Sequence, residues 1–194
     1  MIVSHAHKFV AIGIPKTATR TLFGSLALDG DYSFHMHSTA SSVKNQFEQV
    51  GLSWGSYYKL TLTRNPWDRY YSLFNFLMSR MSVKDDIKAP AVKIFEKITE
   101  NAKSQDAFYC DDNGQVILDH IGKFEDVNAE FESLCGVLDF KGKSLAHLNA
   151  NSYSLASYSD IYRDSRLVDY VAKKEAKVIA LQGYEFDSER LNFE

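Results

Sequence analysis

The stretch Lys8-Phe9-Val10-Ala11-Ile12-Gly13-Ile14, followed at once by Pro15-Lys16-Thr17-Ala18-Thr19-Arg20-Thr21, decides the fold of this chain. Its first half is apolar without alternation, which is typical of a strand that helices cover on both faces. After its second half, Leu22, Phe23 and Leu26 recur at a helical spacing. The stretch therefore predicts a strand, a tight turn and a helix.

The same alternation continues along the chain. Short apolar or aromatic runs predict strands over residues 32–37 and 57–63, and a helix is expected over residues 40–50 between them. Asn65 followed by proline is typical of a helix start, because proline is tolerated at the first helical position. That helix is expected to end near Arg80.

The remainder of the chain is less regular. Our predictions there are a loop at 81–90, a helix at 91–101, a hairpin turn at 112–114, one or two strands within 116–124, a helix around 131–138, and a mostly helical tail at 160–182 that Gly183 ends. Strands that alternate with helices predict an α/β fold. We expect a P-loop-like three-layer arrangement, with a mainly parallel central sheet flanked by helices, in a single domain of residues 1–194.

The composition excludes some classes of protein. The 194 residues are 45% hydrophobic and 24% charged, with a net charge of -3, which suits one globular domain and argues against a nucleic-acid binder or a polybasic membrane anchor. The apolar run at 9–14 is too short for a membrane span, so a cytoplasmic protein is expected. Cys110 and Cys135 have no supporting His or Cys cluster, so no metal site is expected.

Ligands of such sheets collect beyond the carboxyl ends of the strands, and the segment Pro15 to Thr21 follows the first strand. A turn that enters a helix presents backbone N–H groups and the positive end of the helix dipole. Lys16 adds a charge, and Thr17, Thr19 and Thr21 add hydroxyl groups. The segment predicts a phosphate or sulfate site, although a solvated lysine and capping threonines also explain it.

A nucleoside triphosphatase P-loop is the main competing interpretation. Such a loop needs glycines that let its backbone wrap the phosphates. Here Pro15 precedes Lys16, and proline removes a donor and fixes φ. The sequence therefore argues against that loop.

A second anion site is predicted from Arg64 and Ser72. Arg64 ends the third strand, and Ser72 lies about two turns into the next helix, so a guanidinium and a hydroxyl can converge on one anion. The alternative is that Arg64 pairs with Asp68 or caps the helix. Arg69 is expected to be an ion-pair partner, and the aromatic residues 67, 70 and 71 are expected to lie in the core.

Two histidines follow the second strand. His35 and His37 are two residues apart, so they point to the same side of the strand. Imidazole suits proton transfer because its unperturbed pKa lies near neutrality. His37 is our first candidate for a general base and His35 our second, and a structural role for either is an equal alternative.

These motifs carry a family resemblance. Residues 15–19 resemble the 5′-phosphosulfate loop of sulfotransferases, and residues 64–72 resemble their 3′-phosphate motif. The resemblance extends through the segments 121–126, 145–149, 161–162 and 183–186, and it is strongest to the carbohydrate sulfotransferase branch. Two positions differ from the family pattern, since Ala18 replaces a usual glycine and Arg20 a small hydroxyl residue.

The resemblance implies a reaction and a set of roles. The donor would be 3′-phosphoadenosine-5′-phosphosulfate, the product adenosine 3′,5′-bisphosphate, and the acceptor a hydroxyl group, expected to be on a carbohydrate, with no metal required. Arg64 and Ser72 would bind the 3′-phosphate, a histidine such as His37 would take the acceptor proton, and Phe124 would stack on adenine or serve only the core.

Two other functions stay open: a small-molecule kinase that uses ATP and Mg²⁺, and a nucleotide-binding protein without turnover. Residues 81–118 are expected to cover the acceptor.

Overall fold

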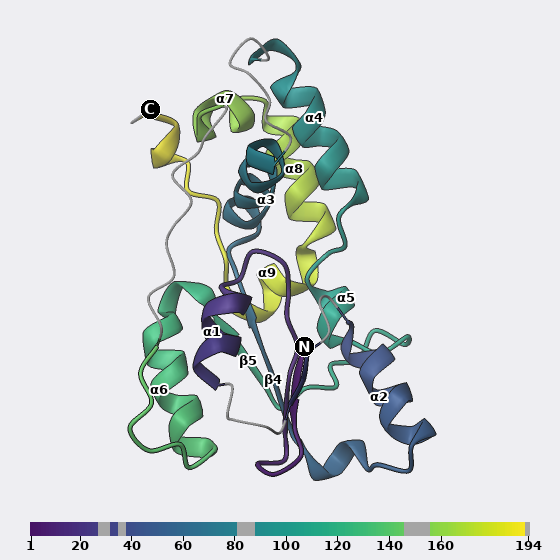
Figure 1. Ribbon diagram of the computed structural model, residues 1–194. Coiled ribbons are helices and arrows are strands. Elements are labelled where there is room, and N and C mark those ends of the chain that lie inside the picture. Colours follow the sequence, from purple (N-terminus) through teal and green to yellow (C-terminus); the bar gives the residue numbers. More distant parts are fainter. Residues whose placement is uncertain (27–31, 35–37, 81–87, 146–155, 193–194) are drawn as a thin grey trace. The chain divides into compact units, whose positions relative to one another are not determined.

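The computed structural model describes residues 1–26, 32–34, 38–80, 88–145 and 156–192 (Figure 1). The chain forms two compact units. The first comprises Met1–Arg64 and Gln105–Leu148, and the second comprises Asn65–Ser104 and Asn149–Glu194. The single domain expected over residues 1–194 stays a prediction.

The first unit is built on a sheet whose described strands number five, in the order β3-β1-β2-β4-β5. They are β1 (Ile2–Ser4), β2 (Phe9–Ala11), β3 (Tyr32–Phe34), β4 (Tyr58–Thr63) and β5 (His120–Lys123). β4 runs parallel to both β2 and β5, whereas β1 is antiparallel to β2 and to β3. All strands except β1 therefore point the same way, which confirms the mainly parallel sheet.

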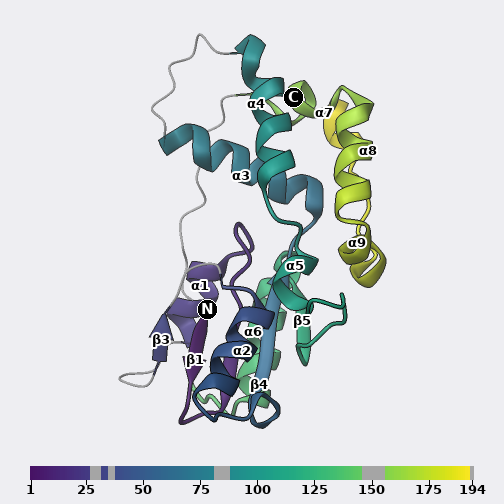
Figure 2. The same cartoon turned by 90° about the vertical axis from the view of Figure 1, so that its right-hand side faces the viewer.

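Helices cover both faces of this sheet, as Figures 1 and 2 show. Successive residues of a strand face opposite sides, so β2 contributes Phe9 and Ala11 to one core and Val10 to the other. The first core also contains side chains of α1 (Thr19–Leu26) and α6 (Val127–Val137), and the second contains side chains of α2 (Ala40–Gln49) and α5 (Asp106–Tyr109). The predicted three layers and the unbroken apolar run of β2 are thereby confirmed. Two 3-10 turns, η1 (Trp54–Ser56) and η2 (Phe124–Asp126), complete the regular structure described here.

The described part of the second unit is helical. Its elements are α3 (Pro66–Arg80), α4 (Lys88–Asn101), α7 (Tyr158–Tyr162), α8 (Ser165–Lys174), α9 (Ala176–Gln182) and η3 (Glu189–Asn192). Asn65 accepts a hydrogen bond from the Trp67 amide at 3.2 Å, which satisfies one N–H at the predicted start of α3. At the other predicted boundary, Gly183 ends α9 with φ 66, a left-handed conformation that costs glycine little.

The structure differs from the sequence predictions at β1 and at the start of α4. The strand β1 was not expected, because three residues are too few to carry a periodic signal. The loop expected over residues 81–90 is too long, since α4 begins at Lys88 and carries Pro90 in its first turn, where a missing N–H needs no replacement. Residues 116–124 contain the strand β5, which confirms the prediction of one or two strands there, and an isolated bridge joins Cys110 to Val116 ahead of it.

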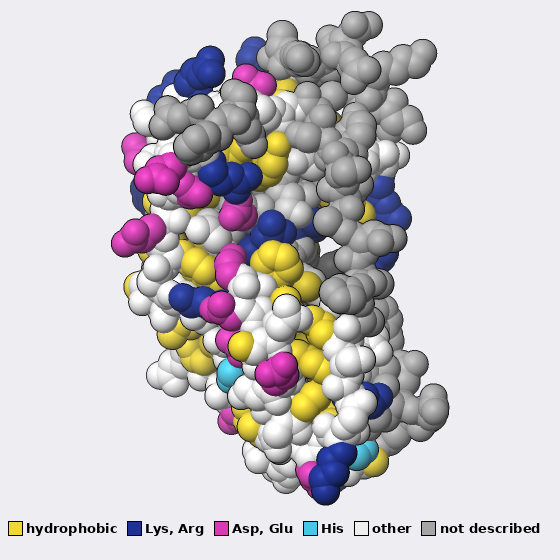
Figure 3. Space-filling view, turned by 90° about the vertical axis from the view of Figure 1, so that its left-hand side faces the viewer, with side chains coloured by type: hydrophobic (Ala, Val, Ile, Leu, Met, Phe, Trp, Pro, Cys, Tyr) yellow, Lys and Arg dark blue, Asp and Glu magenta, His cyan; other side chains and the backbone are white. Residues whose placement is uncertain are grey.

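The surface carries both signs of charge. On the face in Figure 3, basic and acidic side chains of the described residues are intermixed. An anionic ligand must therefore be bound by local groups rather than by a broad positive field. Among the described helices, none combines the length and the hydropathy that a membrane-spanning segment requires.

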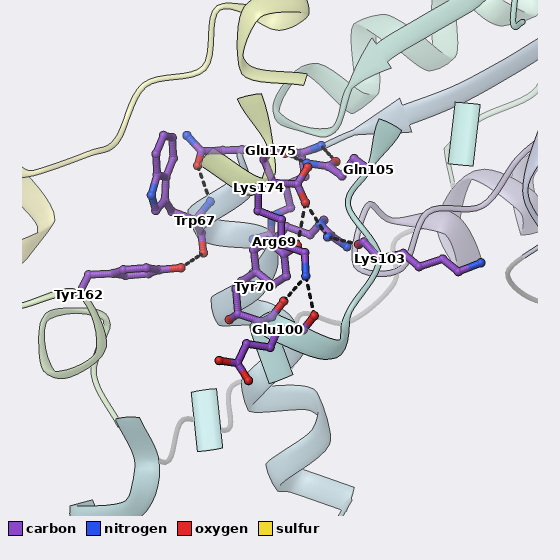
Figure 4. Close-up of polar contacts among 12 residues, drawn as sticks. Trp67, Arg69, Tyr70, Glu100, Lys103, Gln105, Tyr162, Lys174 and Glu175 are labelled. Carbon is purple, nitrogen blue, oxygen red and sulfur yellow. Dashed lines mark hydrogen bonds and ion pairs between the residues drawn. The ribbon is translucent and has the colours of Figure 1, made fainter. Parts of the chain in front are cut away.

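A buried ion pair organises the second unit (Figure 4). Arg69 of α3 is 1% exposed and donates to Glu175 at 2.9 Å and to the carbonyl of Lys103 at 2.8 Å. The Tyr70 hydroxyl donates to the same Glu175 oxygen at 2.9 Å. Arg69 is thus the ion-pair partner that was predicted, and buried charges of this kind are tolerated only when paired. Asp68 pairs with Arg190.

Candidate functional site

The carboxyl ends of three parallel strands place the candidate site. β2, β4 and β5 run in one direction, so their last residues lie at the same edge of the sheet. From that edge the chain continues into the Lys16 turn after β2, into Arg64 after β4 and into Phe124 after β5. Residues far apart in the sequence are thereby brought to one place.

The Lys16 turn is closed by two threonine hydroxyls. Thr17 and Thr19 both donate to the carbonyl of Ile14, at 3.0 and 2.7 Å, and Thr17 is 1% exposed. The Leu22 amide then donates to Ala18 at 3.0 Å and begins the hydrogen-bond ladder of α1. Two of the three threonines predicted as donors to an anion thus hold the turn in this structure, while the first amides of α1 have no acceptor within the helix itself.

The backbone of the turn is left-handed at two residues other than glycine. Lys16 has φ 70 and Ala18 has φ 53, a region that costs an L-residue roughly 1–2 kcal/mol relative to glycine. This explains physically why glycine suits position 18 in the resemblance noted above. Alternating left-handed residues also turn successive N–H groups toward one side, as in backbone anion sites.

Gly13 is a site residue that sequence reasoning did not single out. A Cβ at this position would lie 2.6 Å from the Thr19 methyl group and 3.0 Å from the Phe23 ring. Only a glycine lets α1 approach the end of β2 this closely. The available signal was a glycine inside an apolar strand run, which often marks a close backbone approach.

Arg64 faces the Lys16 turn. Its Nη1 donates to the Lys16 carbonyl at 3.3 Å, and its guanidinium lies 4.4 Å from the centre of the Phe124 ring. A planar guanidinium stacks favourably on an aromatic face. The predicted 3′-phosphate ligand, the predicted adenine neighbour and the Lys16 turn therefore lie together, although Arg64 itself occupies one side of the Phe124 ring.

Positive charge accumulates around Lys16. Partial burial is the largest cause that lowers the pKa of the Lys16 ammonium, and the charges of Arg64 and Arg20 lower it further. Like charges that repel one another become favourable when an anion binds between them. The described residues thus form a site that suits a phosphate or sulfate.

The other predicted site residues differ in burial and in the element that carries them. Pro15 is half-buried in the turn, Arg20 is exposed, and Thr21 lies half-buried in the first turn of α1. Ser72 is half-buried on α3 and belongs to the second unit. His35 and His37 lie outside the described residues.

The aromatic residues next to Arg64 serve the helical core of the second unit. Trp67 is 4% exposed and Tyr70 is 0% exposed, and Tyr71 packs against the same cluster. This confirms the core assignment made from the sequence. In the segments that the structure describes, no group of three or more His, Cys, Asp or Glu side chains is arranged to hold a metal ion.

A strand, a lysine turn and a closely packed helix at the carboxyl edge of a mainly parallel sheet define the class of P-loop-like α/β proteins. Within that class, this chain belongs to the sulfotransferase family, because the family model matches residues 1–194. Its members transfer sulfuryl groups, so the chain is a sulfotransferase in this general sense. Searches of curated proteins and of solved structures found no match.

Proposed function

We propose that this protein transfers a sulfuryl group from 3′-phosphoadenosine-5′-phosphosulfate to a hydroxyl group of a carbohydrate. The observation that carries the proposal is the meeting of Arg64 with the Lys16 turn, where Nη1 lies 3.3 Å from the Lys16 carbonyl. Cationic groups from two strand ends gather there, and their repulsion contributes to the lowered pKa of Lys16. A donor with several anionic groups would offset that repulsion.

The residues present fit such a donor. Gly13 leaves the space beside Thr19 that brings the start of α1 against the turn. The 5′-phosphosulfate end would be held by the Lys16 ammonium and by the first amides of α1. Arg64 is our proposed ligand of the 3′-phosphate, together with Ser72, and Phe124 is our proposed neighbour of adenine.

Donor choice separates this function from that of a kinase. ATP has no 3′-phosphate, so an arginine dedicated to that group selects the sulfuryl donor. The turn also lacks the glycines with which a triphosphatase loop wraps its phosphates, since Pro15 precedes Lys16. These residues favour 3′-phosphorylated adenosine over ATP.

The proposed reaction is a direct transfer in line. The donor supplies an activated sulfuryl group, whose bond to the 5′-phosphate breaks as a bond from the acceptor oxygen to sulfur forms. Lys16 and the amides of the turn stabilise the charge that grows on the 5′-phosphate. His37 accepts the proton of the acceptor hydroxyl, with His35 as the second candidate. Positioning and charge stabilisation supply most of the rate enhancement, as in phosphoryl transfer.

Two measurements test this function. Adenosine 3′,5′-bisphosphate is expected to raise the melting temperature of the protein, because it binds the folded state, and Mg-ATP is expected to raise it little. Labelled sulfate is expected to pass from the donor to a panel of sugars and glycans. The opposite ranking of the two nucleotides would support a kinase, and bisphosphate binding without transfer to any acceptor would support a protein that has lost turnover.

A cytoplasmic location completes the proposal. It rests on the composition alone. Fractionation of cells that express the full-length chain tests it, and recovery with the membranes would contradict it.

A further inference from the structure

The side chain of Gln105 binds the backbone of Arg64 at both of its polar groups. Gln105 Oε1 accepts from the Arg64 amide at 2.9 Å, and Gln105 Nε2 donates to the Arg64 carbonyl at 2.8 Å. Gln105, which is labelled in Figure 4, is 0% exposed. The glutamine therefore pairs with Arg64 as a neighbouring strand would.

The position of Arg64 explains why it needs this partner. The last residue pair between β4 and β5 joins Thr63 to Lys123, so Arg64 lies one residue beyond that ladder. Partly buried backbone N–H and C=O groups need hydrogen-bond partners when no strand supplies them. The Gln105 amide supplies both and extends the regular structure of β4 by one residue.

The side chain of Gln105 does not cap the helix that begins after it. It is the N-cap residue of α5, yet its side chain makes no capping hydrogen bond. Residues such as Ser, Thr, Asp and Asn are favoured at that position because they do cap. The Gln105 side chain therefore stabilises the backbone of Arg64 rather than the start of α5.

The two hydrogen bonds restrain the Arg64 backbone and so fix the direction in which its side chain leaves the chain. With its amide and carbonyl both held, Arg64 has little freedom in φ and ψ, and its guanidinium is directed at the Lys16 carbonyl and the Phe124 ring. We infer that Gln105 is a positioning residue, which holds Arg64 ready to bind the 3′-phosphate of the sulfuryl donor. This inference rests on the proposed function, because it assigns Arg64 to that phosphate.

The inference is tested by the ratio of two affinities, that for adenosine 3′,5′-bisphosphate divided by that for adenosine 5′-phosphate. The two nucleotides differ only in the 3′-phosphate, and calorimetry would measure both affinities. Gln105→Met keeps the length of the side chain and removes both hydrogen bonds. We expect it to weaken bisphosphate binding by up to about 10-fold to 100-fold, the range for losing the charged hydrogen bond from Arg64 to the 3′-phosphate, and to change 5′-phosphate binding little.

A double-mutant cycle and a control separate positioning from general damage. In an Arg64→Ala background, Gln105→Met should leave the ratio unchanged, because the group that it positions is gone. Thr61→Val removes another buried hydrogen bond of β4, from Thr61 to the Ile12 carbonyl at 2.9 Å, and should alter both affinities by the same factor. If Gln105→Met does not fold by circular dichroism, Gln105→Asn keeps an amide that is one methylene too short and should lower the ratio in the same direction.

The possible failures are distinguishable. A wild-type protein that binds the two nucleotides equally would refute the proposed 3′-phosphate site. A wild-type protein that prefers the bisphosphate, with a folded Gln105 variant that keeps the full preference, would refute the positioning role alone. An equal loss of both affinities in the Gln105 variant would also refute it, because such a loss reports only damage to the fold.

Discussion

Substitution of Gly13 by alanine should disturb both the stability and the ligand affinity of the first unit. The new methyl group would lie 2.6 Å from the Thr19 methyl group and 3.0 Å from the Phe23 ring. Thr19 cannot simply rotate away, because its hydroxyl donates to Ile14 at 2.7 Å. Relief of the overlap must therefore move α1 away from the end of β2 or break the turn.

The expected cost follows from the geometry. Overpacking of this kind destabilises a protein by about 1–3 kcal/mol, which corresponds to a fall in melting temperature of about 2–12 °C for a chain of this length. Because α1 presents its first amides to the proposed phosphosulfate site, the affinity for adenosine 3′,5′-bisphosphate should fall together with stability. Thermal melts and calorimetry on the same preparations measure the two effects.

Gly24 provides a matched control on the same helix. It is exposed, and a Cβ there meets no atom within 4 Å. Gly24→Ala should therefore stabilise the protein by about 0.5–1 kcal/mol, the usual gain from alanine in a helix interior, with unchanged nucleotide affinity. A Gly13→Ala protein that melts and binds as the wild type does would show that α1 does not need its close approach to β2.

The remaining predictions concern charge, proton transfer and the helical core. Lys16→Ala should lower the rate of sulfuryl transfer about 100-fold or more, the usual cost of removing one donor to developing charge. Since the pKa of Lys16 is lowered, bisphosphate affinity should fall as the pH rises through that lowered pKa, and Lys16→Arg should retain affinity to higher pH. His37→Ala should spare bisphosphate binding and remove most transfer activity, whereas His35→Ala should have the smaller effect. Glu175→Gln should cost about 3–5 kcal/mol in urea unfolding, because it leaves the buried Arg69 charge uncompensated.

Each of these has a contrary outcome that can be read from the same assay. Normal turnover in Lys16→Ala would remove the lysine from the transfer step. A bisphosphate affinity independent of pH up to the ordinary range of lysine would contradict the role of its charge. Loss of activity in His35→Ala alone would reverse the order of the two histidines, and an unfolding free energy unchanged in Glu175→Gln would show that the Arg69 pair is dispensable.

Local patterns were sufficient for the elements that surround the site. The apolar run before Lys16, the Asn65-Pro66 start and the helical spacing around Phe131 each correspond to an observed strand or helix. Such signals depend on residues close together in the chain, whose contacts are set by the period of the element. The turn at Lys16 could be predicted for the same reason, because it is one continuous segment between a strand and a helix.

Long-range features of the same site could not be predicted in this way. The sequence offers no sign that the Thr17 hydroxyl is turned inward to Ile14, or that the Arg64 guanidinium lies on the Phe124 ring. The antiparallel insertion of β1 beside β2 was missed because three residues carry too little pattern. The division into two compact units also depends on contacts between distant segments.

The sequence by itself determined most of the strands and helices, the lysine turn, the family and the residues available for chemistry, because each of these depends on residues close together in the chain. Tertiary structure alone decided that Gly13 must lack a side chain, that Arg64 meets the Lys16 turn, and that Gln105 holds Arg64 in place. The physical reason is that packing overlaps and backbone hydrogen bonds join residues according to their positions in space. Arg64 and Gln105 are separated by a whole segment of the second unit, and only folding of the first unit brings them within hydrogen-bonding distance.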